Sequence, residues 1–325
     1  MAASRNSLPT DLLQRVGAFA AARIAPGATV HLGLSGGRDS IVLLDLLSRL
    51  PLAGRLAAIH VNHGLSPRAD DWADFCRATC ARLAVPLTVV PVVVDRSTGQ
   101  GLEAAARAAR YAAFADCAGP GGTLLLAQHR GDQAETVLFN LLRGSGVAGA
   151  AGMRDERDSH GLRLLRPLLG TARAEIDAYA QARGLAWIDD ESNEDTRLSR
   201  NFLRHRILPE LNERFPGAEA ALVRAAGHFA EAGELLDALA EVDWQRVADG
   251  DAARLPQLRE LAPARLRNLL RWRLQQLGWQ PPAASRLDEF VRQLLDAAPD
   301  RHPELQLPAG RMRLSRARLR WLPGG

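Results

Sequence analysis

The densest group of residues able to do chemistry is the motif SGGRDS at residues 35–40, which directly follows an apolar stretch. Its two glycines can adopt backbone angles closed to other residues, so main-chain N–H groups can approach an anion, and its two serines add hydroxyl groups. A helix expected over residues 39–50 directs its positive N-terminal end to the same place. Asp39 lies inside this anion site, where phosphates would repel a carboxylate unless a divalent cation lay between them. The motif therefore predicts a phosphate cradle in which Mg²⁺ joins Asp39 to a nucleotide.

The absence of lysine narrows the class of nucleotide site. All 41 residues counted as Lys+Arg are arginines, which excludes a Walker A loop, because that loop needs a lysine after its last glycine. It also excludes Schiff-base chemistry on a lysine of the protein. The motif instead resembles the PP-loop, SGGxDS, of ATP pyrophosphatases, which split ATP into pyrophosphate and an AMP group that passes to a substrate oxygen. The alternative is a glycine turn in an α/β domain that binds no nucleotide, but the order of strand, turn and helix favours the cradle.

A second pair of functional side chains is Asp132 and Glu135, which lie three residues apart at the expected start of a helix. Two interpretations of this pair are open. As a capping box, Asp132 accepts a backbone N–H and Glu135 reaches back, which requires no function. As a site, the two carboxylates share one helix face, hold a cationic substrate or a metal, and take a proton from an ammonium. The position beyond an apolar strand, next to the expected nucleotide loop, favours the site.

Polar residues also follow the second expected strand. Asn62 and His63 lie just beyond it, where a doubly wound sheet usually meets the nucleoside part of its ligand. His60 lies within the strand and is more typical of a hydrogen-bonded core histidine. Arg110, on a later helix, either belongs to an exposed face or supplies a fixed positive charge for a developing phosphate anion. For Asn62 and His63 both the core and the ligand interpretations stay open.

Short apolar strands alternate with helical stretches along the first 130 residues. The strands are expected at residues 29–34, 56–61, 87–93 and 123–127, and the helices at residues 41–50, 68–83 and 102–117. This alternation predicts the α/β class with a doubly wound parallel sheet. Ligands of such sheets bind beyond the carboxyl ends of the strands, which is where the motifs described above occur.

The pattern changes in the later part of the chain. A glycine-rich loop at residues 143–153 predicts a mobile lid before a helix at 171–183, and a basic helix is expected at 197–208. Residues 1–217 are interpreted as the nucleotide-binding catalytic domain. Residues 218–325 are interpreted as a smaller, mainly helical domain that ends in a β-hairpin. The helices of this second domain are expected at residues 218–248, 263–277 and 284–295.

Basic charge is concentrated towards the C-terminus. Residues 196–325 hold 21 arginines against 16 carboxylates, whereas residues 1–195 hold 20 against 21. Apolar residues near the end alternate with arginines around a break at 315–316, which predicts a turn or bulge between two strands with one basic face. That face would carry Arg311, Arg313, Arg318 and Arg320. A basic region joined to a nucleotide-binding region is typical of a protein with a polyanionic partner.

Composition sets the broad limits. The 325 residues suffice for two domains, no apolar run approaches the roughly 18 residues of a membrane span, and the N-terminus lacks a secretory pattern. We therefore expect a cytoplasmic protein without a membrane partner. Cys76, Cys80 and Cys117 are too few for a disulfide framework and form no CxxC, so we expect packed thiols. The sequence does not decide the oligomeric state, and a homodimer is one candidate.

An ordered set of blocks resembles the bacterial tRNA(Ile)-lysidine synthetases over most of residues 30–215. The blocks are SGGRDS, HVNHGLS, EAAARAARY, HRGDQAETVLFNLLRGSG, RPLL and DDESNEDTRLSRNFLRHRILPEL. Any one block occurs by chance, but the ordered set is highly specific. In that family, ATP adenylates the C2 oxygen of the wobble cytidine in a tRNA with anticodon CAU, and free L-lysine then displaces AMP. The product, lysidine, makes the tRNA read AUA as isoleucine instead of AUG.

The resemblance implies roles for individual residues. ATP would be bound by Ser35, Gly36, Gly37, Arg38, Asp39, Ser40, Asn62 and His63. Mg²⁺ would bind Asp39, and Arg110 would face the α-phosphate. Asp132 and Glu135 would receive the lysine ammonium, and one of them, which the sequence does not identify, would take its proton. Contact with tRNA would come from Arg197, Asn201, Arg204, Arg313 and Arg318.

Two features depart from the family pattern. Relatives often read AHH before the acidic pair, whereas this chain has Ala127, Gln128 and His129, which puts any role of the first histidine in doubt. Longer relatives carry another C-terminal domain for which this chain has no room, so we expect either a naturally short form or a truncated one.

Three other classes compete with this interpretation. A PP-loop thiolase usually needs paired cysteines, which this chain lacks. A small-molecule synthetase of the argininosuccinate or NAD type would not need a basic C-terminal half. A non-catalytic RNA-binding protein would not need intact SGGRDS and DQAE motifs.

Overall fold

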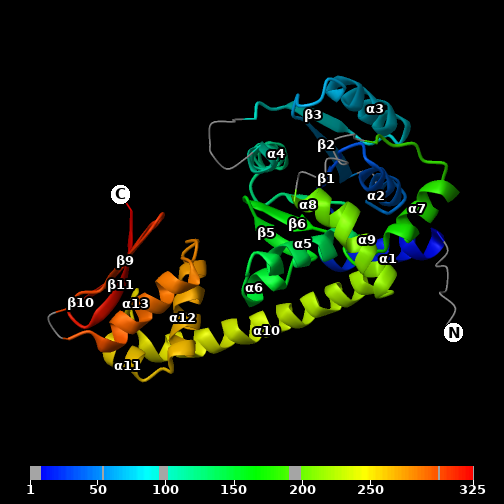
Figure 1. The fold of residues 1–325 in the computed structure, drawn as a ribbon. Helices are drawn as coiled ribbons and strands as arrows, with labels where there is room; N and C mark the ends of the chain where they lie inside the picture. The colour runs from blue at the N-terminus through cyan, green and yellow to red at the C-terminus, as the bar shows by residue number, and fades with distance from the viewer. Residues whose placement is uncertain (1–8, 53–54, 95–101, 190–198, 299–300, 325) are drawn as a thin grey trace. The chain divides into compact units, whose positions relative to one another are not determined.

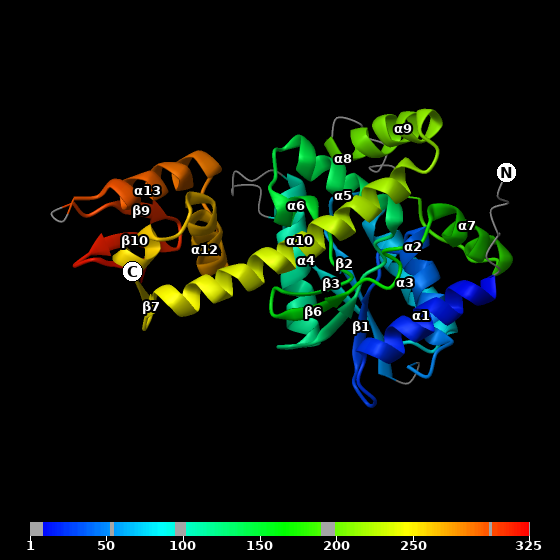
Figure 2. The same ribbon diagram turned by 90° about the horizontal axis from the view of Figure 1, so that it is seen from below.

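The computed structural model describes residues 9–52, 55–94, 102–189, 199–298 and 301–324. The chain divides into two compact units, Met1–Gly227 and His228–Gly325. Figures 1 and 2 show the elements from two directions. Each unit has its own hydrophobic core, so each is described by itself.

The first unit contains a mixed set of helices and strands. In chain order they are α1 (Pro9–Arg23), β1 (Val30–Gly33), α2 (Arg38–Ser48), β2 (Leu56–Asn62), α3 (Ala69–Arg82), β3 (Leu87–Pro91), α4 (Leu102–Ala118), β4 (Thr123–Leu125), α5 (Arg130–Leu142), α6 (Val147–Ala150), β5 (Glu156–Ser159), β6 (Leu162–Leu165), α7 (Arg173–Ala182), α8 (Ser199–Phe202), the π-helix Leu203–Ile207 and α9 (Leu208–Arg214).

The sheet of this unit has the strand order β3-β2-β1-β4-β6-β5. All neighbouring pairs are parallel except β5 and β6, which are antiparallel. Strand order reverses on either side of β1, so the crevice at the carboxyl ends of β1 and β4 is where a ligand of such a sheet binds. The expected doubly wound α/β fold is confirmed. The antiparallel strand β5 lies at one edge of this mainly parallel sheet.

Side chains that alternate along the strands pack into two different cores. Leu32 and Leu125 join one core with α1, α2 and α7, whereas Leu124 and Leu164 join another with α4. Burial on both faces is why these strands read as short continuous apolar runs in the sequence. Figures 1 and 2 show α1, α2 and α7 on one side of the strands and α4 on the other.

The basic helix expected at residues 197–208 is wrong as a single element. The described part begins with α8, passes through the π-helix and continues as α9, with Pro209 in the first turn of α9. Proline lacks the N–H that a helix interior needs, so Pro209 is tolerated only where a new helical segment begins. Residue 197 itself lies outside the described residues.

The second unit combines helices with a small sheet. Its elements are the long helix α10 (Ala218–Val247), which begins in the first unit, β7 (Ala248–Asp249), β8 (Ala252–Arg254), α11 (Leu255–Arg259), α12 (Pro263–Gln276), α13 (Ala284–Asp296), β9 (Glu304–Leu307), β10 (Gly310–Ser315) and β11 (Arg318–Pro323). Helix α10 starts at the first residue of the predicted second domain, whereas the two compact units divide within this helix, between Gly227 and His228, so the predicted boundary stays a prediction.

The C-terminal sheet is antiparallel, with the order β7-β8-β11-β10-β9. The expected hairpin is present as β10 and β11, joined at Arg316 and Ala317, whose φ values are +51° and +57°. Two left-handed residues between antiparallel strands are the signature of a tight hairpin turn. The hairpin expectation was incomplete, because β7, β8 and β9 extend it to five strands.

Candidate active site

The loop between β1 and α2 is held in shape by its own side chains. Ser35 Oγ accepts a hydrogen bond from the Gly37 N–H at 3.2 Å and lies 3.1 Å from Ser40 Oγ, while Ser40 Oγ donates to the Gly37 carbonyl at 2.8 Å. Gly36 has φ +86°, and an added Cβ there would lie 2.6 Å from Ile188 Cδ1. This backbone angle favours glycine, because other residues are strained at it, and a side chain here would also displace the end of Ile188. The loop is thus arranged before any ligand arrives, at the N-terminus of α2.

Asp39, in the first turn of α2, points into a cluster of charged side chains. Nη1 of Arg173 on α7 donates to both carboxylate oxygens of Asp39 at 3.1 Å, and His129 Nε2 lies 3.7 Å from Asp39 Oδ2. Burial raises the pKa of Asp39, and the charges of His129 and Arg173 oppose that rise. Arg173 was not predicted from the sequence. Its position shortly after the carboxyl end of β6 was the one available signal.

Asp39 could bind a divalent cation, because its carboxylate lies at the SGGRDS loop, which is suited to phosphates. The described part of the chain contains no group of three or more His, Cys, Asp or Glu side chains arranged to hold a metal ion. Such an ion would therefore have one protein carboxylate and take its remaining oxygen ligands from phosphates and water, the usual arrangement for Mg²⁺.

Arg38, also predicted to bind ATP, points to the neighbouring helix. Its Nη1 lies 2.8 Å from Asp177 Oδ1 on α7, and its guanidinium lies over the Trp187 ring at 5.3 Å. Arg38 thus connects the loop to α7 through its side chain. A role in ATP binding stays a prediction.

Asp132 has a capping role that differs from the expected one. Helix α5 begins at Arg130, so His129 is the N-cap and Asp132 is the third helical residue: Asp132 Oδ2 accepts from the His129 N–H at 2.9 Å, and His129 Nδ1 accepts from the Gly131 N–H at 3.0 Å. The alternative interpretation, a capping box with Asp132 as N-cap and Glu135 as its partner, is therefore wrong. One oxygen of Asp132 caps the helix, and its other oxygen faces the site.

Glu135 lies one turn further along α5 and has a side chain only 1 % exposed. Arg204 of the π-helix contacts it through Nη2 at 2.8 Å and Nε at 3.0 Å, and Arg200 of α8 through Nη1 at 3.3 Å. Arg204 Nη2 also reaches Asp132 Oδ1 at 2.9 Å. Burial raises the pKa of Glu135, while the Arg204 and Arg200 charges oppose that rise.

His129 links the two predicted sites. Its Nε2 atom lies 3.7 Å from an oxygen of Asp39 and 3.7 Å from an oxygen of Asp132. The phosphate-type loop and the acidic pair are therefore neighbours at the ends of β1 and β4, as their positions in the sequence predict.

The loop after β2 carries Asn62 and His63. Asn62 Nδ2 donates to Asp70 Oδ1 at 2.9 Å, and Asn62 Oδ1 accepts from the Gly64 N–H at 2.9 Å, so this side chain organises its own loop. His63 has a buried Nδ1 without a hydrogen-bond partner among the described residues. Burial and the nearby Arg110 charge lower the pKa of His63, which leaves the ring neutral at pH 7. An unpaired nitrogen of this kind is suited to a polar ligand.

Two further polar residues near these motifs make hydrogen bonds within the fold. Gln128, which departs from the expected family pattern, accepts a hydrogen bond from Arg166 Nε at 2.9 Å. Arg166 is buried and also donates through Nη1 to the Arg154 carbonyl at 2.7 Å. His60, by contrast, lies 2.9 Å from the Leu34 carbonyl through Nδ1 and is a core residue, as expected.

The predicted tRNA-contact residues fall into three situations. Arg197 lies outside the described residues. Asn201 is buried, and Arg204 contacts the two carboxylates. Arg313 and Arg318 lie on the exposed face of the β10–β11 hairpin.

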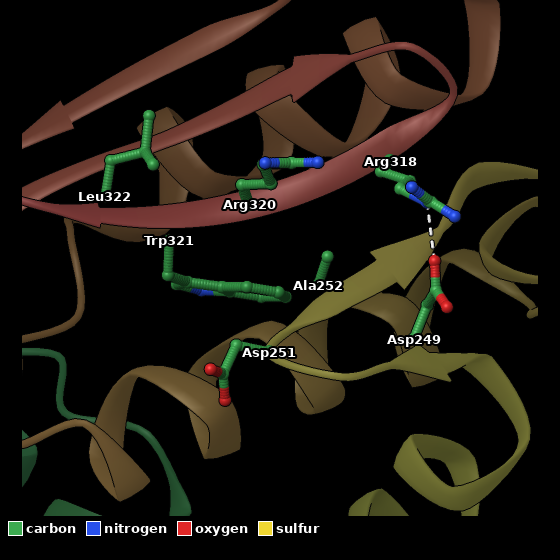
Figure 3. A pocket seen from close by; sticks show the side chains of 7 residues that line it. All are labelled: Asp249, Asp251, Ala252, Arg318, Arg320, Trp321 and Leu322. Atoms are coloured by element: carbon green, nitrogen blue, oxygen red, sulfur yellow. Dashed lines mark ion pairs between the residues drawn. The ribbon is translucent and has the colours of Figure 1, made fainter.

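The hairpin face is basic, with some neutralisation from acidic neighbours. Arg313 is directly opposite Arg320, and Arg313 Nε lies 3.6 Å from Glu304 Oε2. Arg318 Nε lies 2.5 Å from Asp249 Oδ2, as the dashed line in Figure 3 marks. Figure 3 also shows that Arg318 and Asp249 line a pocket together with Arg320 and Trp321.

The class of protein follows from the fold and the loop. Residues 10–211 match the family model of the PP-loop domain, and residues 254–320 match that of the TilS substrate binding domain. The U34-tRNA thiolase NcsA from Methanococcus maripaludis, solved with its 4Fe-4S cluster, has a similar fold. Its TM-score is 0.57 at 18% identity, over 68% of this chain and 78% of that one. The chain is a member of the PP-loop class, whose members use ATP.

Curated relatives identify the family within that class. The tRNA(Ile)-lysidine synthase of Alkalilimnicola ehrlichii is 46% identical over 93% of this chain and 68% of its own length. That of Aromatoleum aromaticum is 49% identical over 89% and 67%, and that of Pseudomonas aeruginosa 45% identical over 89% and 68%. The chain belongs to the tRNA(Ile)-lysidine synthase family. It spans about two thirds of the length of these relatives.

Among the described helices, none has both the length and the apolar character that a lipid bilayer requires of a spanning segment.

Proposed function

We propose that this protein uses ATP to join L-lysine to C2 of the wobble cytidine in tRNA(Ile) with anticodon CAU, forming lysidine. In the first step the C2 oxygen attacks the α-phosphorus of ATP, an O–P bond forms and pyrophosphate leaves. In the second step the lysine amine attacks C2, a C–N bond forms, and AMP leaves with the oxygen. Membership of the family and the match to the TilS substrate binding domain support this reaction. We expect it to take place in the cytoplasm, and a homodimer stays a prediction.

The loop after β1 is suited to the pyrophosphate part of ATP. Its backbone N–H groups lie at the N-terminus of α2, where anions are stabilised, and the Ser35 and Ser40 hydroxyls lie beside them. Asp39 would hold Mg²⁺, which would offset the charge of the leaving pyrophosphate. Binding of that ion requires Arg173 to share or release Asp39 and to pair with a phosphate oxygen instead. Arg110 would stabilise charge at the α-phosphate.

The acidic pair is suited to the lysine amine. A buried carboxylate whose pKa is raised accepts a proton more readily than an exposed one, and burial raises the pKa of Glu135. Asp132 has one oxygen committed to the helix cap and one directed at the site. Either carboxylate could take the proton from the ammonium before attack on C2.

One observation carries the proposal: His129 Nε2 lies 3.7 Å from both Asp39 and Asp132. An activated base and an incoming amine must meet within a few ångströms, because proximity supplies much of the rate of a two-substrate reaction. The loop that carries Asp39 and the acidic pair that includes Asp132 both lie next to His129, so their ligands would be close enough to react.

Sulfur transfer, the reaction named for the thiolase with the similar fold, is disfavoured by the thiols of this chain. Cys76 and Cys80 are buried, and burial raises the pKa of the first to about 12 and of the second to about 11. Thiols of this kind are protonated and unreactive at neutral pH.

The test is transfer of labelled lysine to an isoleucine tRNA bearing CAU, with ATP and Mg²⁺. A matched tRNA carries uridine at the wobble position. Label on the CAU tRNA alone is the expected result. Cleavage of ATP to AMP and pyrophosphate without lysine transfer would retain the PP-loop chemistry and exclude lysine as the acceptor amine.

A further inference from the structure

The place proposed for the lysine ammonium is filled by a cation of the chain itself. The Arg204 guanidinium bridges Asp132 Oδ1 at 2.9 Å and Glu135 Oε2 at 2.8 Å, and its Nε makes a further bond to Glu135 at 3.0 Å. A guanidinium that bridges two carboxylates in this way supplies them with the hydrogen-bond donors and the positive charge that an incoming ammonium would otherwise supply.

The two arginines at the site are held differently. Arg200 has one contact with Glu135 at 3.3 Å and also lies over the Phe139 ring at 5.5 Å, so it has a support that does not depend on the carboxylates. Among the described residues, Arg204 makes its hydrogen bonds and ion pairs with Asp132 and Glu135. The Arg204 side chain is 42 % exposed while that of Glu135 is 1 % exposed, so Arg204 has access to solvent and Glu135 does not.

Charge balance at the acidic pair opposes its occupation by all three cations together. With Arg200 in place, an added ammonium beside Arg204 would bring three positive charges to two carboxylates within contact distance. Like charges at such separations repel strongly where water is scarce. Burial lowers the pKa of Arg204, but the charges of Glu135 and Asp132 outweigh burial and the pKa rises. Arg204 therefore does not relieve the repulsion by losing its proton.

The backbone around Arg204 is unusual in a way that allows movement. Arg204 lies in the π-helix Leu203–Ile207, between the buried side chains of Leu203 and Leu208. π-Helical turns are rare and are frequently found at functional sites. A segment anchored at both ends by apolar contacts can move its exposed side chain without losing its place.

We propose that Arg204 is a resident competitor of lysine: its guanidinium occupies the acidic pair in the free protein and must withdraw before the lysine amine binds. This inference rests on the proposed function. Arg204 is then a specificity-determining residue, because only a ligand that places a cation between both carboxylates displaces it. The apparent affinity for lysine is reduced by the fraction of molecules in which Arg204 is seated.

The experiment measures binding of labelled lysine at equilibrium, with ATP and without tRNA, for the wild type and Arg204→Gln. We expect the variant to bind lysine about tenfold more tightly or better. Arg206→Gln, a substitution of an exposed arginine in the same π-helix, is the matched control and should leave the affinity unchanged. Equal or weaker binding by Arg204→Gln would overturn the proposal, since a purely structural arginine should weaken the site when removed.

A measurement on the wild type keeps the test independent of how the variant folds. Guanidinium chloride at low, non-denaturing concentration should raise KM for lysine and leave kcat unchanged, against sodium chloride of equal ionic strength. In Arg204→Gln the guanidinium ion should compete more strongly, because the acidic pair is then open to it. No competition in either protein would overturn the proposal. Loss of lysine transfer by the wild type itself would instead indicate failure of the proposed function.

Discussion

The charged side chains of the candidate site in the first unit and of the C-terminal hairpin in the second are exposed to different degrees. In the first unit, carboxylates such as Glu135 and Asp39 are buried or partly buried and contact specific arginines at 2.8–3.3 Å. On the C-terminal hairpin, Arg313 and Arg318 are exposed, and their acidic neighbours, Glu304 and Asp249, lie at the edge of the same sheet. Catalysis requires side chains held in fixed positions around the reacting atoms. Binding to the phosphate backbone of a nucleic acid depends more on the density of positive charge than on exact geometry. We therefore propose that bond making belongs to the first unit and that the hairpin of the second unit contributes tRNA affinity.

The largest effect is expected from Asp39→Asn. The substitution keeps the shape of the side chain but removes the charge proposed to hold Mg²⁺, so lysine transfer should fall by about 10³-fold. Affinity for tRNA, measured by filter binding, should change by less than about twofold if the comparison holds. A parallel fall in both quantities would contradict the division between the units.

Asp132→Ala separates lysine transfer from ATP cleavage within the first unit. Lysine transfer should fall by about 10²-fold, because the amine loses one of its two carboxylates, while tRNA binding should be much less affected. ATP cleavage to AMP and pyrophosphate on tRNA should continue, because adenylation does not need the amine. Asp74→Ala, which removes an exposed carboxylate of α3, is the control. Equal loss of transfer and tRNA binding would argue against a lysine site at Asp132.

Charge reversal on the hairpin face tests the other side of the comparison. Arg313→Glu combined with Arg318→Glu should weaken tRNA binding by about tenfold or more and flatten its dependence on salt by roughly one unit of slope per lost phosphate contact. Arg292→Glu, on the exposed face of α13, should have a smaller effect. An unchanged salt slope in the double variant would move the RNA surface elsewhere.

The smallest effect concerns the support behind the catalytic loop. Tyr179 on α7 donates to Asp45 Oδ2 on α2 at 2.6 Å, and Arg183 Nε contacts the same oxygen at 3.2 Å. Tyr179→Phe leaves the buried Asp45 with fewer donors, and we expect the free energy of unfolding to fall by about 1–3 kcal/mol without loss of tRNA affinity.

The pH dependence of this contact has a defined sign. Burial and the Asp45 hydrogen bond raise the pKa of Tyr179 from 10.0 to about 12. The stabilisation from the neutral phenol is therefore complete below pH 10 and is lost as the pH rises towards 12. Denaturant unfolding should show a larger alkaline loss in the wild type than in Tyr179→Phe, because the buried thiols of Cys76 and Cys80, whose pKa values are also raised, contribute a loss to both proteins. The same alkaline loss in both proteins would assign it to other groups.

Local patterns predicted the parts of the site that lie within one motif. The SGGRDS loop, the strand ends and the helix that carries Asp132 and Glu135 are encoded by turn residues and apolar periodicity, and all occur where expected. Arg173 could not be placed at Asp39, because the two are 134 residues apart and meet only when α7 packs against α2. The contact of Arg204 with the acidic pair is likewise tertiary, across 69 and 72 residues.

Short and irregular elements could not be predicted from the sequence for a different reason. Strands β7 and β8 have two and three residues, too few for an alternating pattern to appear. Strand β5 reads ERDS, which has no apolar residue to indicate a strand, and it forms only by pairing with β6. The π-helix has no sequence signature of its own.

The most direct test of the division between the units is turnover at saturating tRNA. Lysine transfer is measured for Asp39→Asn and for the Arg313→Glu, Arg318→Glu double variant while the concentration of tRNA(Ile) with CAU is raised. We predict that the hairpin variant reaches the wild-type kcat at saturating tRNA, because only its affinity for tRNA is impaired. The kcat of Asp39→Asn should stay low at any tRNA concentration. A hairpin variant whose kcat stays low at saturation would contradict this division, since the C-terminal arginines would then take part in the chemistry itself.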